Sequence, residues 1–551
     1  MSPLVQVRQG KLCGVKEKNI YGKEFYAFRG IPYTKPPVGE LRFKDPEPPE
    51  SWTGVRDAKK FGNIALQYDN ASQKVIGSED CLFLNIYTNT LNPIASKSVM
   101  VWIHGGAWIM GSGNDDMHGP DYLIEKDIVL VTINYRLGIL GKFAQLWEKL
   151  SLNLKYIMNT LFVGFLNLND EKAAGNQALK DQVMALRWVQ QNIEKFGGDV
   201  NNVTIFGDSV GAASVHYLTL SPLAKGLFHK AILQSGVATN PWGSAPYSGV
   251  ETAVKISSLL GKKITDTKEL IEYLRTVDAA RLVDAERAVR PWNKLHLLEN
   301  PFVPSIDSKS KNPFLNIPVE EAAKFGIQVP HIIGYTSHEG IIILTDMNEK
   351  IFAEVEDNQE ELLCHPNIKR FLQKRNISVK DVKNFFMGNN KISNENVNLY
   401  VDLMSAVNFL INIQHTLEIQ LSISNIQSYV YKFEYFSKDS VVLQKLIGTN
   451  FEGTSHGEDI FYLFCPKILN KLGMKPPAFG STEYIIQQRF LELFTTFAKT
   501  GNPNPKKSDL IQIKWQPVDS SMTYSCLKIS ENLSMIKESN ILHDILKEIE
   551  K

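Results

Sequence analysis

One stretch constrains the fold of this chain more than any other, the run Val-Thr-Ile-Phe-Gly-Asp-Ser-Val-Gly-Ala-Ala-Ser at residues 203–214. A short segment rich in β-branched residues ends in Gly-x-Ser-x-Gly and leads through small residues into a helical-looking stretch, 214–220. That order predicts a strand, a sharp turn with Ser209 at its apex and then a helix, the pattern of a nucleophile elbow. Gly207 and Gly211 suit this turn because strand and helix approach too closely there for side chains.

Strand and helix patterns alternate along the rest of the chain. Strands are predicted at residues 99–104, 128–134, 203–208, 231–233, 332–334 and 429–435, and helices at residues 178–196, 251–260, 269–277 and 484–499. This alternation predicts an α/β protein whose large central sheet is mostly parallel and flanked by helices. Residues 11–28 alternate polar and apolar side chains, which predicts a small N-terminal antiparallel sheet. The proline-dense stretch at 29–39 predicts a fixed loop.

Length and composition are those of an ordinary globular protein. The 551 residues are 43% hydrophobic and 22% charged, and neither a repeat nor a change in composition divides them. We therefore expect a single domain over residues 1–551, since proteins built on one large sheet reach this size. The formal charge is +1 and no basic stretch occurs, so the expected partner is a small molecule and not nucleic acid or a membrane surface.

The first residues and the cysteines bear on cellular location. Residues 1–8 lack the apolar core of a signal peptide, and no apolar run could span a bilayer, so we expect a soluble cytoplasmic protein without a membrane anchor. Five cysteines, an odd number with no Cys-x-x-Cys pair, predict buried thiols instead of a disulfide framework or a structural zinc site.

One segment, residues 142–163, interrupts the pattern. It is rich in Leu, Lys, Asn, Phe and Ile, and several of its apolar residues fall near one face of a helix, which would make it an added amphipathic helix. The alternative is a translated, unspliced intron. Codons at its two ends can contain a splice donor and an acceptor in the same reading phase, and its removal joins Gly141 smoothly to Phe165. We favour the intron hypothesis.

Two loops downstream of Ser209 offer the partners that a serine nucleophile needs. The hydroxyl needs a neighbouring base, and the base needs a carboxylate that fixes its tautomer. Glu339 follows an apolar strand, and His456 lies in a glycine-flanked loop before an aromatic run. The order Ser, acid, His is the one that α/β-hydrolases use. Ser209, Glu339 and His456 are therefore the predicted catalytic residues.

Other residues compete for these roles. His338 is the second choice of base, but it adjoins Glu339, and sequence neighbours cannot easily bond both each other and the serine. The rivals for the acid are Asp307, Glu458 and Asp459.

A tetrahedral intermediate also needs N–H donors for its negative oxygen. The run His-Gly-Gly-Ala-Trp at 104–108 follows a predicted strand and offers flexible backbone for this purpose. Gly106 and Ala107, with Val210 from the elbow, are the predicted oxyanion donors. A simple turn is the alternative interpretation of the glycine pair.

Together these motifs resemble the type-B carboxylesterases, which are cholinesterase-like α/β-hydrolases, and especially the intracellular α-esterases associated with detoxification in insects. The likeness covers nearly the whole chain, including residues 28–39, 78–82, 104–108, 134–138, 175–182, 207–211, 234–236, 334–340, 453–459 and 497–503. The resemblance implies an α/β-hydrolase fold, carboxylic ester hydrolysis, no cofactor or metal, and two buried ion pairs, Arg42 with Glu79 and Arg136 with Asp181. Trp242 is similar to the acyl-pocket aromatic residue of α-esterases, with plain core packing as the alternative.

Three positions depart from the family pattern. The elbow commonly reads Gly-Glu-Ser-Ala-Gly, whereas Asp208 and Val210 stand here, and Ala107 replaces a third glycine. Backbone donors survive these changes, but the added methyl groups narrow the space for the acyl group, and Asp208 is expected to tune the electrostatics beside the serine. We expect hydrolysis of small to medium hydrophobic esters, in detoxification or in lipid or xenobiotic metabolism. The alternative is a slow-turnover protein that sequesters esters or organophosphates on the same scaffold.

Overall fold

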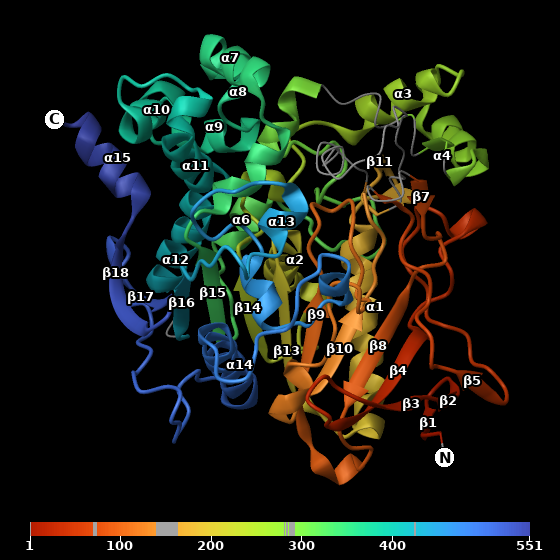
Figure 1. The fold of residues 1–551 in the computed structure, drawn as a ribbon. Helices are drawn as coiled ribbons and strands as arrows, with labels where there is room; N and C mark the ends of the chain where they lie inside the picture. Colours follow the sequence, from red (N-terminus) through yellow and green to blue (C-terminus); the bar gives the residue numbers. More distant parts are fainter. Residues whose placement is uncertain are drawn as a thin grey trace.

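The computed structural model describes residues 2–69, 74–138, 164–279, 281–282, 285, 292–423 and 426–551. Within these ranges eleven strands form one large sheet through the middle of the molecule (Figure 1). From edge to edge they are β18 (Leu533–Ser539), β17 (Thr523–Ile529), β16 (Ser428–Phe433), β15 (His331–Thr336), β14 (Lys230–Gln234), β13 (Gly198–Asp208), β9 (Lys97–Ile103), β10 (Val129–Ile133), β8 (Phe83–Thr88), β4 (Glu24–Pro32) and β3 (Val15–Lys18).

The middle of this sheet is parallel and its edges are antiparallel. All neighbouring strands from β10 to β17 pair in parallel. The edge strands β18, β8, β4 and β3 pair antiparallel. The predicted fold class is therefore confirmed. Because the carboxyl ends of parallel strands meet at one edge, the residues that follow β13 and β15 are brought together.

Helices cover both faces of the sheet. The long ones are α1 (Gln177–Asn192), α2 (Val210–Leu220), α3 (Gly249–Leu259), α4 (Thr267–Thr276), α7 (Glu349–Asp357), α9 (Pro366–Gln373), α10 (Val379–Met387), α11 (Val397–Ser405), α12 (Ile411–Ile423), α14 (Thr482–Thr500) and α15 (Ile541–Ile549), and the short ones α6 (Val319–Ala323), α8 (Gln359–Leu362) and α13 (Leu443–Ile447). Successive residues of β9 enter different cores, since Val101 packs in the cluster that contains α1 and α2, and Trp102 packs in the one that contains α14.

The predicted elements agree with the observed ones to within a few residues. The exception is the N-terminal region. The antiparallel hairpin expected within residues 11–28 is formed by β3 and β4, but these strands belong to the edge of the large sheet. The separate small sheet consists of β1 (Leu4–Val7), β2 (Gly10–Cys13), which pairs antiparallel with β1, and β5 (Val55–Asp57), which joins β2 in parallel. The prediction of a loop from residue 29 is wrong for residues 29–32, because β4 continues to Pro32 through an irregularity between Phe28 and Ile31. Pro32 is the last residue of the strand, where proline is tolerated.

Both implied ion pairs are present; the pair of Arg136 and Asp181 is buried, and that of Arg42 and Glu79 is largely buried, with side chains 9% and 13% exposed. Arg42 and Glu79 approach to 2.6 Å, as do Arg136 and Asp181, whose side chains are 2% and 0% exposed. Breaking such a buried pair costs about 3–5 kcal/mol, because one charge is left without a partner. These pairs thus fix the segments around residues 42 and 136 to the body of the domain.

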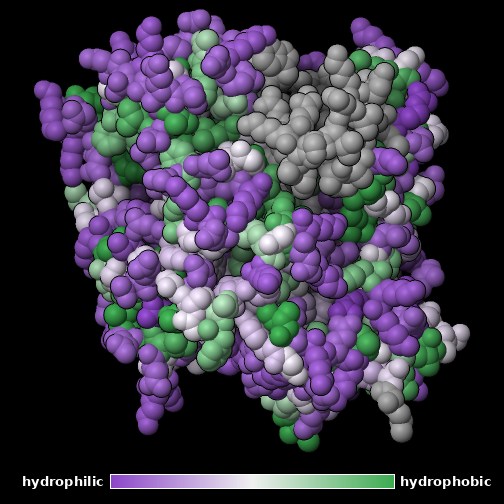
Figure 2. Space-filling model, in the orientation of Figure 1, coloured by the Kyte–Doolittle hydropathy of each residue, from purple (hydrophilic) through white to green (hydrophobic). Residues whose placement is uncertain are grey.

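The remaining global predictions have different outcomes. All five cysteines are free thiols, and four of them are buried, as expected. Within the described ranges, none of the helices combines the length and the apolar character needed to cross a bilayer. Hydrophilic side chains predominate on the face shown in Figure 2, with smaller apolar groups between them. The segment 142–163 lies outside the described residues, so both interpretations of it remain predictions.

Candidate active site

Ser209 occupies the sharp turn between β13 and α2, as the elbow pattern predicts. Its backbone has φ 58° and ψ −125°, a conformation that costs a non-glycine residue about 1–3 kcal/mol. The two glycines permit the turn: a Cβ atom on Gly211 would lie 2.1 Å from the Ile103 carbonyl oxygen, and one on Gly207 would lie 2.6 Å from the Gly211 backbone. The strain is offset in part by a 2.8 Å hydrogen bond from the Ser209 N–H to the Gln234 carbonyl oxygen.

Glu339 and His456 are brought into direct contact from loops 117 residues apart. His456 Nδ1 lies 2.5 Å from Glu339 Oε2. The other carboxylate oxygen of Glu339 accepts hydrogen bonds from the Ser235 hydroxyl and the Thr336 N–H, both at 2.7 Å. Glu339 is fully buried and His456 is 8% exposed. The carboxylate is therefore held from one side and presents its second oxygen to the imidazole.

The two loops are also joined through their backbones. The His338 N–H donates to the Thr454 carbonyl oxygen at 3.0 Å, and His338 and Ser455 form an isolated parallel bridge.

Burial lowers the pKa of His456, but the charge of Glu339 and its hydrogen bond raise it more, to about 9. The environment of this imidazole thus favours its protonated form.

The rival residues have other partners. His338 Nδ1 contacts the Ser337 hydroxyl at 2.8 Å and its ring packs against Phe451. Asp307 is paired with Lys180 at 2.8 Å, and Glu458 accepts the N–H groups of Val442 and Gln444. Asp459 accepts from the Tyr431 hydroxyl at 2.6 Å and from the Gln234 amide at 3.0 Å.

The predicted oxyanion loop packs directly on the elbow. A Cβ atom on Gly105 would lie 2.8 Å from the Asp208 carbonyl oxygen and 3.2 Å from Ser209 Cβ. Gly106 and Ala107 both have positive φ, 110° and 53°, which turns their peptide planes out of the strand direction. Val210 is the first residue of α2, where helix N–H groups have no partner within the helix. The three predicted donors thus lie on two backbone segments that flank Ser209.

Asp208 is buried in the floor of the site. Its Oδ2 lies 3.2 Å from the Cβ position of Gly105 and 3.6 Å from that of Gly457, the residue after His456. Burial raises the pKa of this carboxyl to about 8; the positive charge on His456 opposes the rise, and the carboxylates of Asp459 and Glu339 add to it. The surroundings of Asp208 therefore favour its protonated, neutral form.

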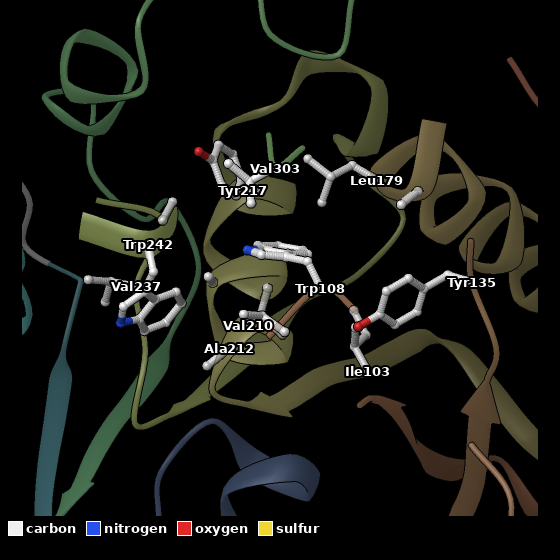
Figure 3. Packing of buried hydrophobic residues seen from close by; sticks show 14 of the residues in the cluster. Ile103, Trp108, Tyr135, Leu179, Val210, Ala212, Tyr217, Val237, Trp242 and Val303 are labelled. Carbon is white, nitrogen blue, oxygen red and sulfur yellow. The ribbon is translucent and has the colours of Figure 1, made fainter. Parts of the chain in front are cut away.

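Trp242 lies on the side of the elbow where β14 ends. Its ring comes within 3.0 Å of the Cβ position of Gly236, and that same position is 2.3 Å from the Ser209 carbonyl oxygen. Figure 3 shows the Trp242 indole next to Val237, and the Val210 side chain next to the Trp108 indole. Since Trp242 is only 4% exposed, it both fills the core and closes the space beside Ser209.

Several residues of this site carried no role in the sequence-based prediction. The sequence indicates Ser235 and Gln234 only as part of a family motif, although the Ser235 hydroxyl donates to Glu339 and the Gln234 backbone carbonyl accepts the Ser209 N–H. Phe409 packs its ring 4.6 Å from that of His456, and no local pattern indicated it. Among the described residues no cluster of His, Cys, Asp and Glu side chains could hold a metal ion.

Comparison with known proteins identifies the family of this chain. The family described as "Carboxylesterase family" matches residues 1–157 and 160–543. Juvenile hormone esterase of Tribolium castaneum is 32% identical over 92% of this chain and 85% of its own, and esterase E4 of Myzus persicae is 32% identical over 95% and 90%. The solved structure of juvenile hormone esterase from Manduca sexta superposes with a TM-score of 0.82 at 27% identity, over 100% of this chain and 99% of that one.

The sheet and its flanking helices therefore define an α/β-hydrolase. The chain belongs to the carboxylesterase family and is a serine carboxylesterase, an enzyme that hydrolyses carboxylic esters.

Proposed function

We propose that Ser209, His456 and Glu339 form the catalytic triad of this esterase. Ser209 Oγ attacks the ester carbonyl carbon while His456 Nε2 takes its proton, and the same nitrogen then protonates the departing alcohol. Water attacks the acyl-enzyme by the reverse route, which releases the acid and restores the serine. Glu339 stays ionised throughout and stabilises the imidazolium. The observation that carries this assignment is the 2.5 Å contact between His456 Nδ1 and Glu339 Oε2, beside the strained Ser209 turn.

In this proposal the negative oxygen of the tetrahedral intermediate accepts hydrogen bonds from the N–H groups of Gly106, Ala107 and Val210. The packing of the Gly105 segment against Asp208 and Ser209 supports it, because the two backbone segments hold each other in place before substrate arrives.

The substrates that fit this site are hydrophobic esters with a slim acyl group. Trp242 supports this assignment, since its indole lies against Gly236 beside Ser209 and its N–H is bonded to the Asn408 carbonyl oxygen at 3.0 Å. The methyl of Ala107 and the side chain of Val210 narrow the site further. A role in detoxification, or in lipid or xenobiotic ester metabolism, follows from this range of substrates. Five free thiols support a cytoplasmic location, where thiols stay reduced.

The second candidate is a slow-turnover protein that is acylated quickly and sequesters esters or organophosphates. The departures at Ala107 and Val210 favour it, because their added methyl groups narrow the space in which water must attack the acyl-enzyme.

Release of p-nitrophenol from p-nitrophenyl acetate separates the two candidates. A steady rate that Ser209→Ala abolishes and that Ser214→Ala, a change on the same helix, leaves in place supports turnover. A burst equal to the enzyme concentration without a steady rate supports sequestration. A steady rate that survives in Ser209→Ala overturns the triad assignment. Acetate, butyrate and octanoate esters test the acyl site, where Trp242→Leu is expected to favour the longer chains.

A further inference from the structure

A single π-helical turn, Ala406–Leu410, joins α11 to α12 near the candidate site. Its signature is the hydrogen bond from the Ile411 N–H to the carbonyl oxygen of Ala406, five residues earlier. A π-turn widens a helix and leaves carbonyl groups free for other donors, and such turns frequently occur at functional sites.

The loop after β14 uses the carbonyl groups of this turn. The Asn240 side-chain amide donates to the carbonyl oxygens of Asn408 and Phe409 at 2.9 and 3.0 Å, and the Trp242 indole N–H donates to Asn408 at 3.0 Å. Asn240 Oδ1 in turn accepts the Val237 N–H at 2.7 Å. The amide of Asn240 is thus fully used and clamps the π-turn to the segment beside Ser209.

The turn places the ring of Phe409 against the imidazole of His456. The two ring centroids are 4.6 Å apart with 39° between the planes, and Phe409 is 1% exposed. The Phe409 ring also lies 5.8 Å from that of Trp242. One face of the imidazole is therefore covered by an aromatic ring whose own position is fixed.

The same helix contacts the acid loop. The Gly340 N–H donates to the Ser405 hydroxyl at 2.8 Å, and a Cβ atom on Gly340 would lie 2.3 Å from the Val401 carbonyl oxygen. Residues 401–409 thus touch both the segment that bears Glu339 and the ring of His456. A shift of this helix would change the position of the base relative to the acid.

The bond to Glu339 alone does not fix the plane of the imidazole, since a single hydrogen bond tolerates small rotations of the ring about the Cβ–Cγ bond. We propose that Phe409, held by the Asn240 clamp on the π-turn, is a positioning residue that keeps His456 Nε2 aimed at Ser209 in both acylation and deacylation. This inference rests on the proposed role of His456 as the base. The aromatic face also favours the imidazolium that forms in each transition state.

The test compares Phe409→Leu with Phe352→Leu, using p-nitrophenyl acetate. Phe352 is similarly buried, at 5%, and packs on Tyr400 of α11, so its truncation disturbs the same helix without removing the ring that lies against His456. For Phe409→Leu we expect kcat to fall about tenfold with KM within about twofold of wild type, because a misaligned base loses part of the rate gain from proton transfer. The acid limb of the pH profile is expected to move to lower pH. Phe352→Leu is expected to keep the wild-type kcat and KM.

Asn240→Ala provides a second route to the same answer, because it releases the π-turn without changing the ring. Asn240→Ala is expected to lower kcat, as Phe409→Leu does. A thermal unfolding transition measured for each variant establishes that the variant is folded. If a folded Phe409→Leu keeps the wild-type kcat on acetate and alters only the preference for longer acyl chains, Phe409 merely lines the acyl site and the inference is overturned. Loss of the proposed function itself would look different, as a steady rate that persists in Ser209→Ala.

Discussion

The Ser235 hydroxyl donates a 2.7 Å hydrogen bond to Glu339 Oε1, the carboxylate oxygen that faces away from His456. Ser235 is the first residue after β14 and has a positive φ of 56°, which directs its side chain across to the end of β15. Together with the Thr336 N–H it fixes the plane of the carboxylate. The run Gln-Ser-Gly at the end of β14 thus has a physical reason for the serine at its middle position.

Removal of this hydroxyl is expected to impair catalysis more than stability. Ser235→Ala should lower kcat/KM for p-nitrophenyl acetate about tenfold, since a hydrogen bond to a charged group contributes about 1.5–3 kcal/mol. Ser221→Ala is the matched control, because that buried hydroxyl donates at 2.8 Å to the Phe314 carbonyl oxygen away from the site. Equal rates for the two variants would contradict the role of Ser235.

The pH dependence of kcat/KM follows from the environment of His456. The base must be neutral in the free enzyme, and Glu339 raises the imidazole pKa to about 9 against the effect of burial. Activity should therefore rise with pH through a limb centred above the ordinary histidine value of about 6.5. In Glu339→Gln this rising limb should move to lower pH, and the value of kcat/KM on the plateau at high pH should fall. A limb that stays in place in this variant would show that another group controls it.

Asp208 is expected to reduce stability as pH rises. Its folded-state pKa is raised to about 8, so the folded protein keeps a proton that the unfolded chain releases above its ordinary pKa. Each pH unit between the two values costs up to about 1.4 kcal/mol. Asp208→Asn should therefore raise the unfolding temperature more at pH 7.5 than at pH 5, where less of this cost is present. An unfolding temperature that changes with pH in the same way in both proteins would contradict this prediction.

Ala107 holds a backbone conformation that glycine prefers. With φ at 53°, Ala107→Gly relieves strain of about 1 kcal/mol and also removes a methyl group next to the predicted oxyanion donors. We expect unchanged or slightly higher stability and a faster rate on branched-chain esters relative to acetate, measured as a ratio of kcat/KM values. Ala212→Gly, within α2, should instead lower stability. An unchanged selectivity ratio would remove Ala107 from the acyl site.

The elbow and the two loops could be predicted because their signals are local. Gly207 and Gly211 indicate a close approach without any knowledge of what approaches, and the structure identifies it as the Ile103 carbonyl and the turn itself. Glu339 and His456 were singled out by strand ends and flanking glycines, and their contact follows from the parallel sheet.

Contacts between distant segments could not be predicted in this way. The pairing of β5 with β2 in parallel joins residues about forty positions apart, and alternation alone does not give strand direction. Phe409 is one apolar residue in a long helical run, and it lies in a π-turn whose carbonyl groups bind Asn240 from another segment. The sequence pattern of a helix does not report such a turn.

The end of β14 serves four partners with three consecutive residues. The backbone carbonyl of Gln234 accepts the Ser209 N–H, and its side-chain amide donates to Asp459. The Ser235 hydroxyl donates to Glu339, and Gly236 leaves room for the Ser209 carbonyl. Because neighbouring residues of a strand point to opposite faces, loss or gain of one residue here would assign every partner to the wrong side chain. Natural or laboratory evolution is therefore restricted here both in the length of the segment and in the exchange of its residues, which leaves the surrounding loops as the place where new specificities can arise.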